Sequence, residues 1–278
     1  MNSALLVRKF IITLIFLSIC NVAISENVTK DKTISSDSTT QQVFTADDIT
    51  LTISSNATLS RSKKPIVADD RSGVTVTINE GSEVFTTSGD NAIVGKSSTN
   101  LTVNNSGKIY SAGAKAVSFR QGSGANVSNN AGATIYADTN TISGNHSDTE
   151  NATITNSGTI YSTDASTNTI KFDSASTGNS IVNNTGGEIY TEGTGATIKL
   201  GASSTLTNSG TIKTGSVSSR AINAAGSNNT ITLKDDGKII GIISSASGTT
   251  GNKLQMQHGF GQGYFYETSG DFTLEDLD

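Results

Sequence analysis

The chain has 278 residues, of which 40 are Thr, 39 Ser, 28 Gly and 25 Asn, whereas it has one Pro, one Cys and no Trp. Its net charge is −5 and only 15% of its residues are charged, so the composition disfavours a nucleic-acid-binding protein. Because Ser, Thr, Asn and Gly are poor helix formers, we also expect little helix. Extended structure remains, either as a polar disordered tract or as a β architecture with a narrow apolar seam.

Residues 1–25 have the features of a secretory signal peptide. Arg8 and Lys9 precede an apolar run over residues 10–19, and a small-x-small triplet ends at Ser25. We therefore expect cleavage between Ser25 and Glu26. The apolar run is shorter than the roughly 20 residues that span a bilayer, which disfavours a membrane anchor.

A lipoprotein anchor is a further alternative for this leader. It would need a small residue before the lipidated cysteine, whereas Cys20 follows Ile19. Cleavage after Ser25 would leave a mature chain without cysteine. Such a chain forms no disulfide, so its core alone must stabilise the fold.

An internal repeat occupies residues 49–251, after a polar amino-terminal segment or cap over residues 26–48. The clearest copies, Leu101–Tyr110, Ala152–Tyr161 and Ser204–Lys213, share the pattern x-Thr-aliphatic-x-Asn-Ser-Gly-x-Ile. Seven copies are recognisable, and their corner glycines are spaced by 24 to 28 residues, a period near 26. These corner glycines are Gly81, Gly107, Gly132, Gly158, Gly186, Gly210 and Gly237. Compositional drift would produce neither the period nor fixed apolar positions.

Each copy contains three short apolar elements. In one copy Leu101 and Val103 flank a polar residue, Ile109 follows the corner, and Val117 and Phe119 again flank a polar residue. Alternation with a period of two predicts strands with one face inside and one outside. Asn and Gly tolerate a left-handed backbone and suit the corners. Three strands and three corners per copy predict an all-β fold, a right-handed parallel β-helix of about seven to eight rungs.

An aromatic residue recurs after the aliphatic residue that follows the corner. The members are Phe85, Tyr110, Tyr136, Tyr161 and Tyr190. Stacked in register, these rings would stabilise successive rungs. The alternative is a platform for carbohydrate. We favour the structural role, because the ladder stops at Lys213 without a break in the repeat.

Few residues are candidates for chemistry. His146 and His258 are the only histidines, and no nucleophile or metal-binding motif surrounds them. Glu83 and Glu188 occupy equivalent positions of rungs that are not adjacent, as on a solvated face. We therefore expect no enzymatic activity, no catalytic or metal site and no cofactor. A β-helix enzyme acting on polysaccharide is the alternative.

The carboxyl end changes character over residues 252–278, where 5 of the 15 aromatic residues lie. We expect an aromatic cap or junction there, because the last rung would otherwise expose apolar side chains and unpaired strand edges.

In four features the chain resembles the passenger domains of bacterial autotransporters, the type V secretion family. These features are the signal peptide, the Asn-Ser-Gly-x-Ile-Tyr rungs, the cysteine-free mature chain, and the end segments Gly259–Tyr266 and Asp271–Asp276. The resemblance covers the chain from residue 45 onward. It implies export through the inner membrane of a Gram-negative bacterium, and a location at the cell surface, in the outer membrane or outside the cell. It also implies an outer-membrane translocator barrel as a partner.

Such a barrel is built from alternating strands of about ten residues, and no series of that kind precedes Asp278. We therefore expect a passenger without its own translocator, or a truncated fragment with no independent activity. The role implied for an intact passenger is a non-enzymatic adhesion or surface-interaction rod. Its partner would be a host, matrix or cell-surface receptor or glycan, and not a nucleic acid.

Overall fold

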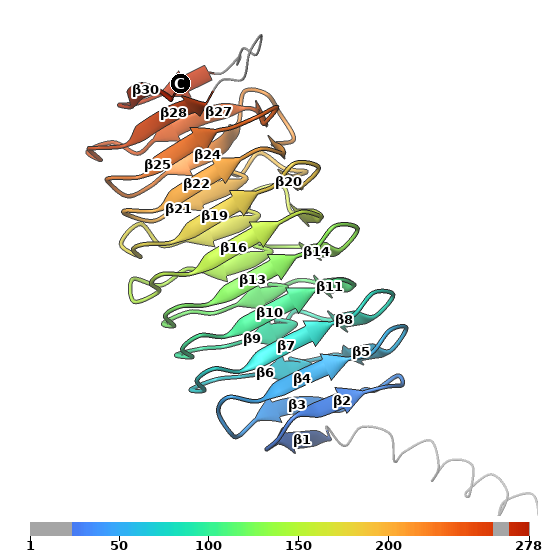
Figure 1. The fold of residues 1–278 in the computed structure, drawn as a ribbon. Helices are drawn as coiled ribbons and strands as arrows, with labels where there is room; N and C mark the ends of the chain where they lie inside the picture. The colour runs from blue at the N-terminus through green and yellow to red at the C-terminus, as the bar shows by residue number, and fades with distance from the viewer. Residues whose placement is uncertain (1–23, 258–266, 278) are drawn as a thin grey trace, which may run out of the picture.

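The computed structural model describes residues 24–257 and 267–277, so the expected signal peptide lies outside the described residues up to residue 23, Cys20 included. The described chain is an all-β parallel solenoid of about nine turns with a period near 25 residues, and these residues form no helix. Three parallel sheets run along the rod, with the strands of successive turns stacked one above the other (Figure 1). The expected all-β parallel solenoid is confirmed. Accordingly, within the described ranges there is no helix of the length and hydropathy that crossing a membrane requires.

Three strands, one from each sheet, make up a complete turn. Sheet A contains, in spatial order, β1 (Ser25–Val28), β3 (Gln41–Phe44), β6 (Ile66–Val67), β9 (Ile93–Val94), β12 (Val117–Ser118), β15 (Ile142–Gly144), β18 (Ile170–Phe172), β21 (Ile198–Leu200), β24 (Arg220–Ala224), β27 (Ile242–Ser245) and β29 (Glu267–Ser269). Sheet B contains β2 (Lys32–Ile34), β4 (Thr50–Ile53), β7 (Thr75–Ile78), β10 (Thr102–Asn105), β13 (Asn126–Asn129), β16 (Thr153–Asn156), β19 (Ser180–Asn183), β22 (Thr205–Asn208), β25 (Thr230–Leu233), β28 (Lys253–Gln257) and β30 (Thr273–Leu277). Sheet C contains β5 (Thr58–Arg61), β8 (Glu83–Thr86), β11 (Lys108–Ser111), β14 (Thr134–Ala137), β17 (Thr159–Ser162), β20 (Glu188–Thr191), β23 (Thr211–Lys213) and β26 (Lys238–Ile240).

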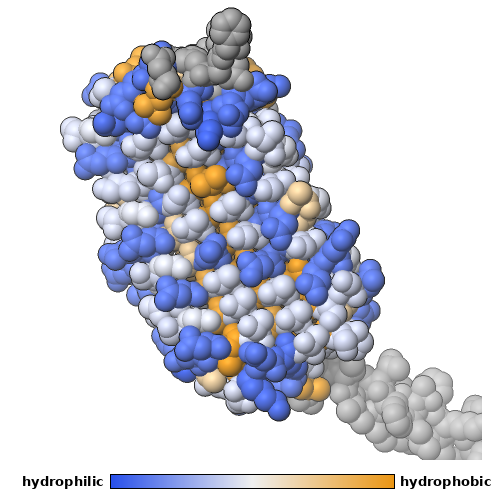
Figure 2. Space-filling model, viewed as in Figure 1, coloured by the Kyte–Doolittle hydropathy of each residue, from blue (hydrophilic) through white to orange (hydrophobic). Residues whose placement is uncertain are grey.

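The interior of the rod is a continuous apolar core made of columns of like residues. In sheet B, for example, Val76, Val103, Val127 and Ile154 lie opposite one another in successive strands, and each is at most 1% exposed. The alternating residues point outward and are mostly Thr, Ser and Asn. The surface in Figure 2 is therefore largely white and blue, with orange visible in narrow strips between the outward side chains.

The rod has about nine turns, so the expected seven to eight rungs were too few. β1, β2 and β3 lie at the amino-terminal end, where the repeat pattern is not recognisable, yet they pair in register with β3, β4 and β6. The corner before β5 has Asn56, with a φ of 65°, at the position that Gly81 takes in the next turn. Asn tolerates this left-handed conformation. Counting corner glycines therefore overlooks that turn.

The seven corner glycines are required for two different reasons. Three of them adopt φ values between +75° and +82°, namely Gly81, Gly132 and Gly186. Four others lack a positive φ, but a Cβ there would overlap a main-chain oxygen of the preceding turn: Gly107, Gly158, Gly210 and Gly237. The left-handed backbone thus explains why glycine is needed at the first three positions, and lack of space for a Cβ explains the need for glycine at the other four.

A ladder of buried asparagines ends the strands of sheet B in five successive turns. Its members are Asn105, Asn129, Asn156, Asn183 and Asn208, each at most 1% exposed. The Nδ2 of each of the first four donates to the Oδ1 of the next at 2.8 to 2.9 Å. Each Nδ2 also donates to main-chain carbonyls of the corner that follows, so the buried amides are satisfied. This asparagine ladder links five turns through side chains as well as through the main chain.

Candidate functional site

The aromatic residues expected to form a ladder lie on the outer face of sheet C. Neighbouring ring centroids are 4.4 to 5.0 Å apart, with angles of 3° to 11° between ring planes, from Phe85 through to Tyr190. The Nζ of Lys213 lies 4.6 Å from the ring of Tyr190 and ends the stack. The inner rings therefore have their faces against one another. Stacking on a sugar needs an open ring face, so this geometry favours the structural role over the carbohydrate platform.

Burial raises the pKa of Tyr161 to about 12, and the neighbouring rings of Tyr136 and Tyr190 add to the shift. Because a tyrosine in an unfolded chain has a pKa of about 10, the ladder stabilises the folded chain fully below about pH 10, and this contribution is lost as the pH rises toward 12. We expect phenolate absorbance of the folded chain to show a transition near pH 12, and the urea midpoint to fall between about pH 10 and 12. A titration with every midpoint near 10 would contradict this.

The two carboxylates considered for an enzyme lie far apart on sheet C. Glu83 and Glu188 share one outward row, with Lys108, Thr134 and Thr159 between them. Four strand spacings of about 4.8 Å place them about 19 Å apart, whereas carboxylates that cleave a glycosidic bond are about 5 to 9.5 Å apart. Each instead contacts a lysine of the following turn.

The other residues considered for chemistry are also dispersed. His146 lies after β15, with its Nδ1 3.7 Å from the carboxylate of Asp148, and His258 lies outside the described residues.

Glu26, the residue after the expected cleavage site, is in β1, where a hydrogen bond from Lys32 lowers the pKa of its carboxyl group. Within residues 24–257 and 267–277, no three His, Cys, Asp or Glu side chains gather as a metal site would require. The segment Gly259–Tyr266 lies outside the described residues.

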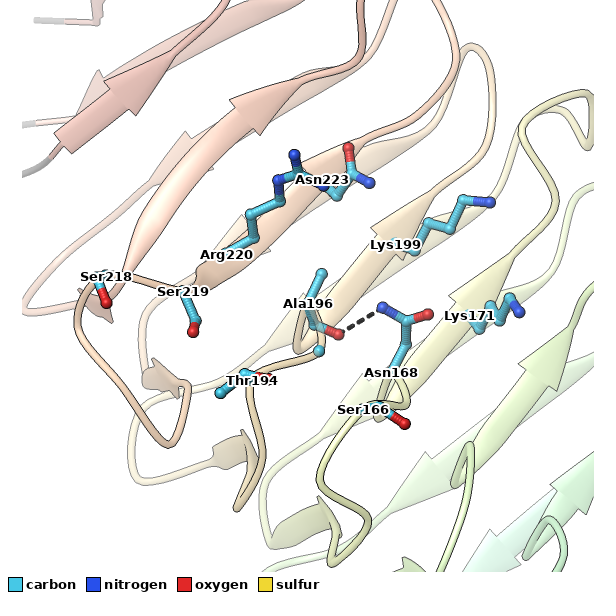
Figure 3. Close-up of a pocket in the computed structure, with 11 residues that line it drawn as sticks. Ser166, Asn168, Lys171, Thr194, Ala196, Lys199, Ser218, Ser219, Arg220 and Asn223 are labelled. Atoms are coloured by element: carbon cyan, nitrogen blue, oxygen red, sulfur yellow. Dashed lines mark hydrogen bonds between the residues drawn. The ribbon is translucent and has the colours of Figure 1, made fainter.

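A polar groove crosses three consecutive turns on the outer side of sheet A (Figure 3). Its volume is about 530 Å³. Lys171 of β18, Lys199 of β21 and Asn223 of β24 lie side by side in register along its floor. The loops that lead into these strands and the start of β24 supply the remaining lining residues: Ser166, Asn168, Thr194, Gly195, Ala196, Ser218, Ser219 and Arg220. None of these lining residues is acidic.

Hydrogen bonds hold the loops along the groove in place. The Nδ2 of Asn168 donates to the carbonyl of Ala196 at 2.7 Å, as drawn in Figure 3. The carboxylate of Asp164, in the loop beside the groove, accepts hydrogen bonds from the main-chain N–H groups of Ser166 and Thr167 at 2.7 and 3.0 Å. These bonds lower the pKa of Asp164 and keep its carboxylate bound to the main chain of its own loop. The carboxylate therefore forms no ion pair with Lys171 or Lys199.

The groove is cationic because Lys171 and Lys199 lie directly opposite each other on neighbouring strands, with Arg220 beginning the next. Across the part of the chain that the structure describes, no acidic side chain forms an ion pair with any of the three. The positive region extends toward Lys115, whose pKa is lowered by burial and further by the charges of Arg120 and Lys171. This cationic groove stands out on a chain with a net charge of −5.

The sequence contains a signal for this groove, since Lys occupies the centre of both Ile170–Phe172 and Ile198–Leu200. Only the in-register stacking of β18 on β21 shows that the two lysines are neighbours. Together, the fold and the groove define a parallel β-solenoid with ordered polar faces and a cationic groove. A scan against protein-family models and a search of curated proteins find no match to this chain.

Proposed function

We propose that the chain is an exported, non-enzymatic binding rod of the autotransporter-passenger kind, which contacts host, matrix or cell surfaces. The observation that carries this proposal is the regularity of its outward faces. On sheet B, Thr102, Asn126, Thr153, Ser180 and Thr205 form one row of hydrogen-bonding side chains, each one strand from the next. Solenoids use such extended surfaces to bind large partners.

The export route is part of the same proposal. The signal-peptide pattern of residues 1–25 supports passage through the inner membrane, and an outer-membrane translocator barrel is the partner that the family resemblance implies.

The handedness of the solenoid is a further part of the proposal. Because the crossovers between parallel strands of one sheet are right-handed in almost all proteins, we propose that the solenoid is right-handed.

Export is tested by fusing residues 1–30 to a reporter enzyme that is active only outside the cytoplasm. We expect reporter activity, and we expect it to be lost when aspartates replace Ile12 and Ile15, because a charged segment cannot act as the apolar region of a signal peptide. Equal activity of the intact and the altered fusion would contradict export by this segment.

Binding is tested with the labelled, folded chain on immobilised host cells and matrix. We expect retention on these surfaces, loss of retention after unfolding in urea, and no new reducing ends from a panel of polysaccharides. Release of reducing ends that is abolished by Glu83→Gln or Glu188→Gln would overturn the proposal in favour of the enzyme. Absence of retention on every surface would also overturn it.

A further inference from the structure

We propose that the cationic groove binds a short segment of acidic polysaccharide, with carboxylate or sulfate groups of the sugar against Lys171, Lys199 and Arg220. This inference rests on the proposed function, because it names the class of ligand that the binding rod recognises. It places the binding of this ligand in three turns, those of β18, β21 and β24.

The charge arrangement of the groove points to an anionic ligand. Lys171 and Lys199 are directly opposite each other in adjacent parallel strands, and like charges in this position destabilise a sheet. Neighbouring turns carry Ser143 and Asn223 at the same position, so the strand does not require a lysine there. An anion bound between the two ammonium groups would relieve the repulsion. Arg220 adds a planar group that can donate two parallel hydrogen bonds to one carboxylate or sulfate.

The uncharged lining of the groove fits the hydroxyl groups of a sugar. The hydroxyls of Ser166 and Thr194 already donate to Asp164 and to the carbonyl of Ala165, so their oxygens are available as acceptors. Ser218 and Ser219 supply two further hydroxyl groups. The amides of Asn168 and Asn223 supply further donors and acceptors, and the first of them is already fixed by its bond to the next loop. The wall therefore keeps its shape before a ligand arrives, which lowers the entropic cost of binding.

Other polyanions fit the groove less well. Proteins that bind single-stranded nucleic acid stack its bases on aromatic side chains, and the groove has no aromatic lining residue. The tyrosines of the chain that the structure describes stack on one another on sheet C. An acidic peptide would add to a free strand edge or insert side chains into apolar pockets, whereas β18, β21 and β24 are paired on both sides and Ala196 is the only apolar side chain of the lining.

The test measures binding of oligosaccharides to the full chain by calorimetry. The probes are an oligogalacturonate, its methyl-esterified neutral form, a sulfated oligosaccharide of similar length and a deoxythymidine oligonucleotide. The variants are Lys171→Gln/Lys199→Gln and Arg220→Gln. The matched control is Lys96→Gln/Lys238→Gln, which removes the same two charges from exposed positions outside the groove.

We expect the oligogalacturonate or the sulfated probe to bind the unaltered chain at least tenfold more tightly than the neutral ester and the oligonucleotide. The preference between the two anionic probes identifies the sugar group. The double groove variant is expected to lose at least tenfold in affinity, and the control to lose less than twofold. Thermal melting should show the double groove variant to be at least as stable as the unaltered chain, because the like-charge contact is gone.

Equal affinity for the neutral ester, equal losses in the groove and control variants, or tighter binding of the oligonucleotide would each overturn the inference. If the unaltered chain adheres to surfaces and binds neither anionic probe, the inference fails while the proposed function stands. If it adheres to no surface either, both fail.

Discussion

Replacing Asn156 with alanine is expected to lower the free energy of unfolding by about 3 to 5 kcal/mol, since each buried polar group left without a partner costs about 1 to 3 kcal/mol. Asn156 is the central member of the asparagine ladder. Its Oδ1 accepts from Asn129 at 2.9 Å, and its Nδ2 donates to Asn183 at 2.8 Å. It also exchanges hydrogen bonds with the main chain of Gly158 at 3.0 and 3.2 Å. Alanine removes all of these bonds at a site that water does not reach.

The measurement is equilibrium unfolding in urea, with Thr155→Ala as the matched control. Thr155 is the preceding residue of β16 and faces outward, so its replacement is expected to change stability by no more than about 0.5 kcal/mol. Hydrogen exchange should locate the effect of Asn156→Ala in the turns on either side, since solenoid turns contact mainly their neighbours. Similar losses in both variants would show that the ladder contributes no more than an outward threonine.

Replacing Gly158 with alanine is expected to destabilise the chain by about 3 kcal/mol, the upper end of the range for overpacking. The added Cβ would overlap the main-chain oxygens of Ala133 and Asn130 in the preceding turn. The oxygen of Ala133 accepts the amide of Thr159 at 2.9 Å and cannot withdraw without breaking the sheet ladder. The strain cannot be relieved by rotating a side chain.

Gly132→Ala is the comparison, because Gly132 lies in the same corner of the previous turn, two residues before β14, whereas Gly158 directly precedes β17. Gly132 has a φ of +80° and open space around its Cα, so alanine there meets only the left-handed backbone penalty of about 1 to 2 kcal/mol. Urea unfolding should therefore rank Gly158→Ala well below Gly132→Ala in stability. The reverse order would mean that backbone conformation, and not space, limits these corners.

The three-stranded turn could be predicted from sequence because its signal is local. Leu101, Val103 and Ile109 alternate with polar residues, and inward residues of this kind recur in every well-formed copy. A strand buried on one face and exposed on the other requires this alternation. The terminal turns lack a complete pattern, because a strand such as β2 needs only main-chain pairing and one buried residue, Ile34, to join the sheet.

The asparagine ladder and the groove could not be predicted in the same way. Asn105 and Asn156 precede Ser-Gly and look like corner residues, and nothing local shows that their amides point inward to meet one another. Lys171 and Lys199 are 28 residues apart and become neighbours only through the exact register of β18 and β21. Both features depend on contacts between turns, which a local pattern does not specify.

The asparagine ladder also bears on strand slippage. A strand of sheet B that slid by two residues would keep its inward and outward faces, so apolar patterning alone would not oppose the error. In the laddered turns such a slip would set Asn129 against Ile154, separating two amides that otherwise bond to each other. A single buried asparagine fixes the alignment of coiled-coil helices in the same way. Five turns thus have one favoured alignment built into their side chains, whereas the turns with Ile78 or Leu233 at this position depend on their corners for it.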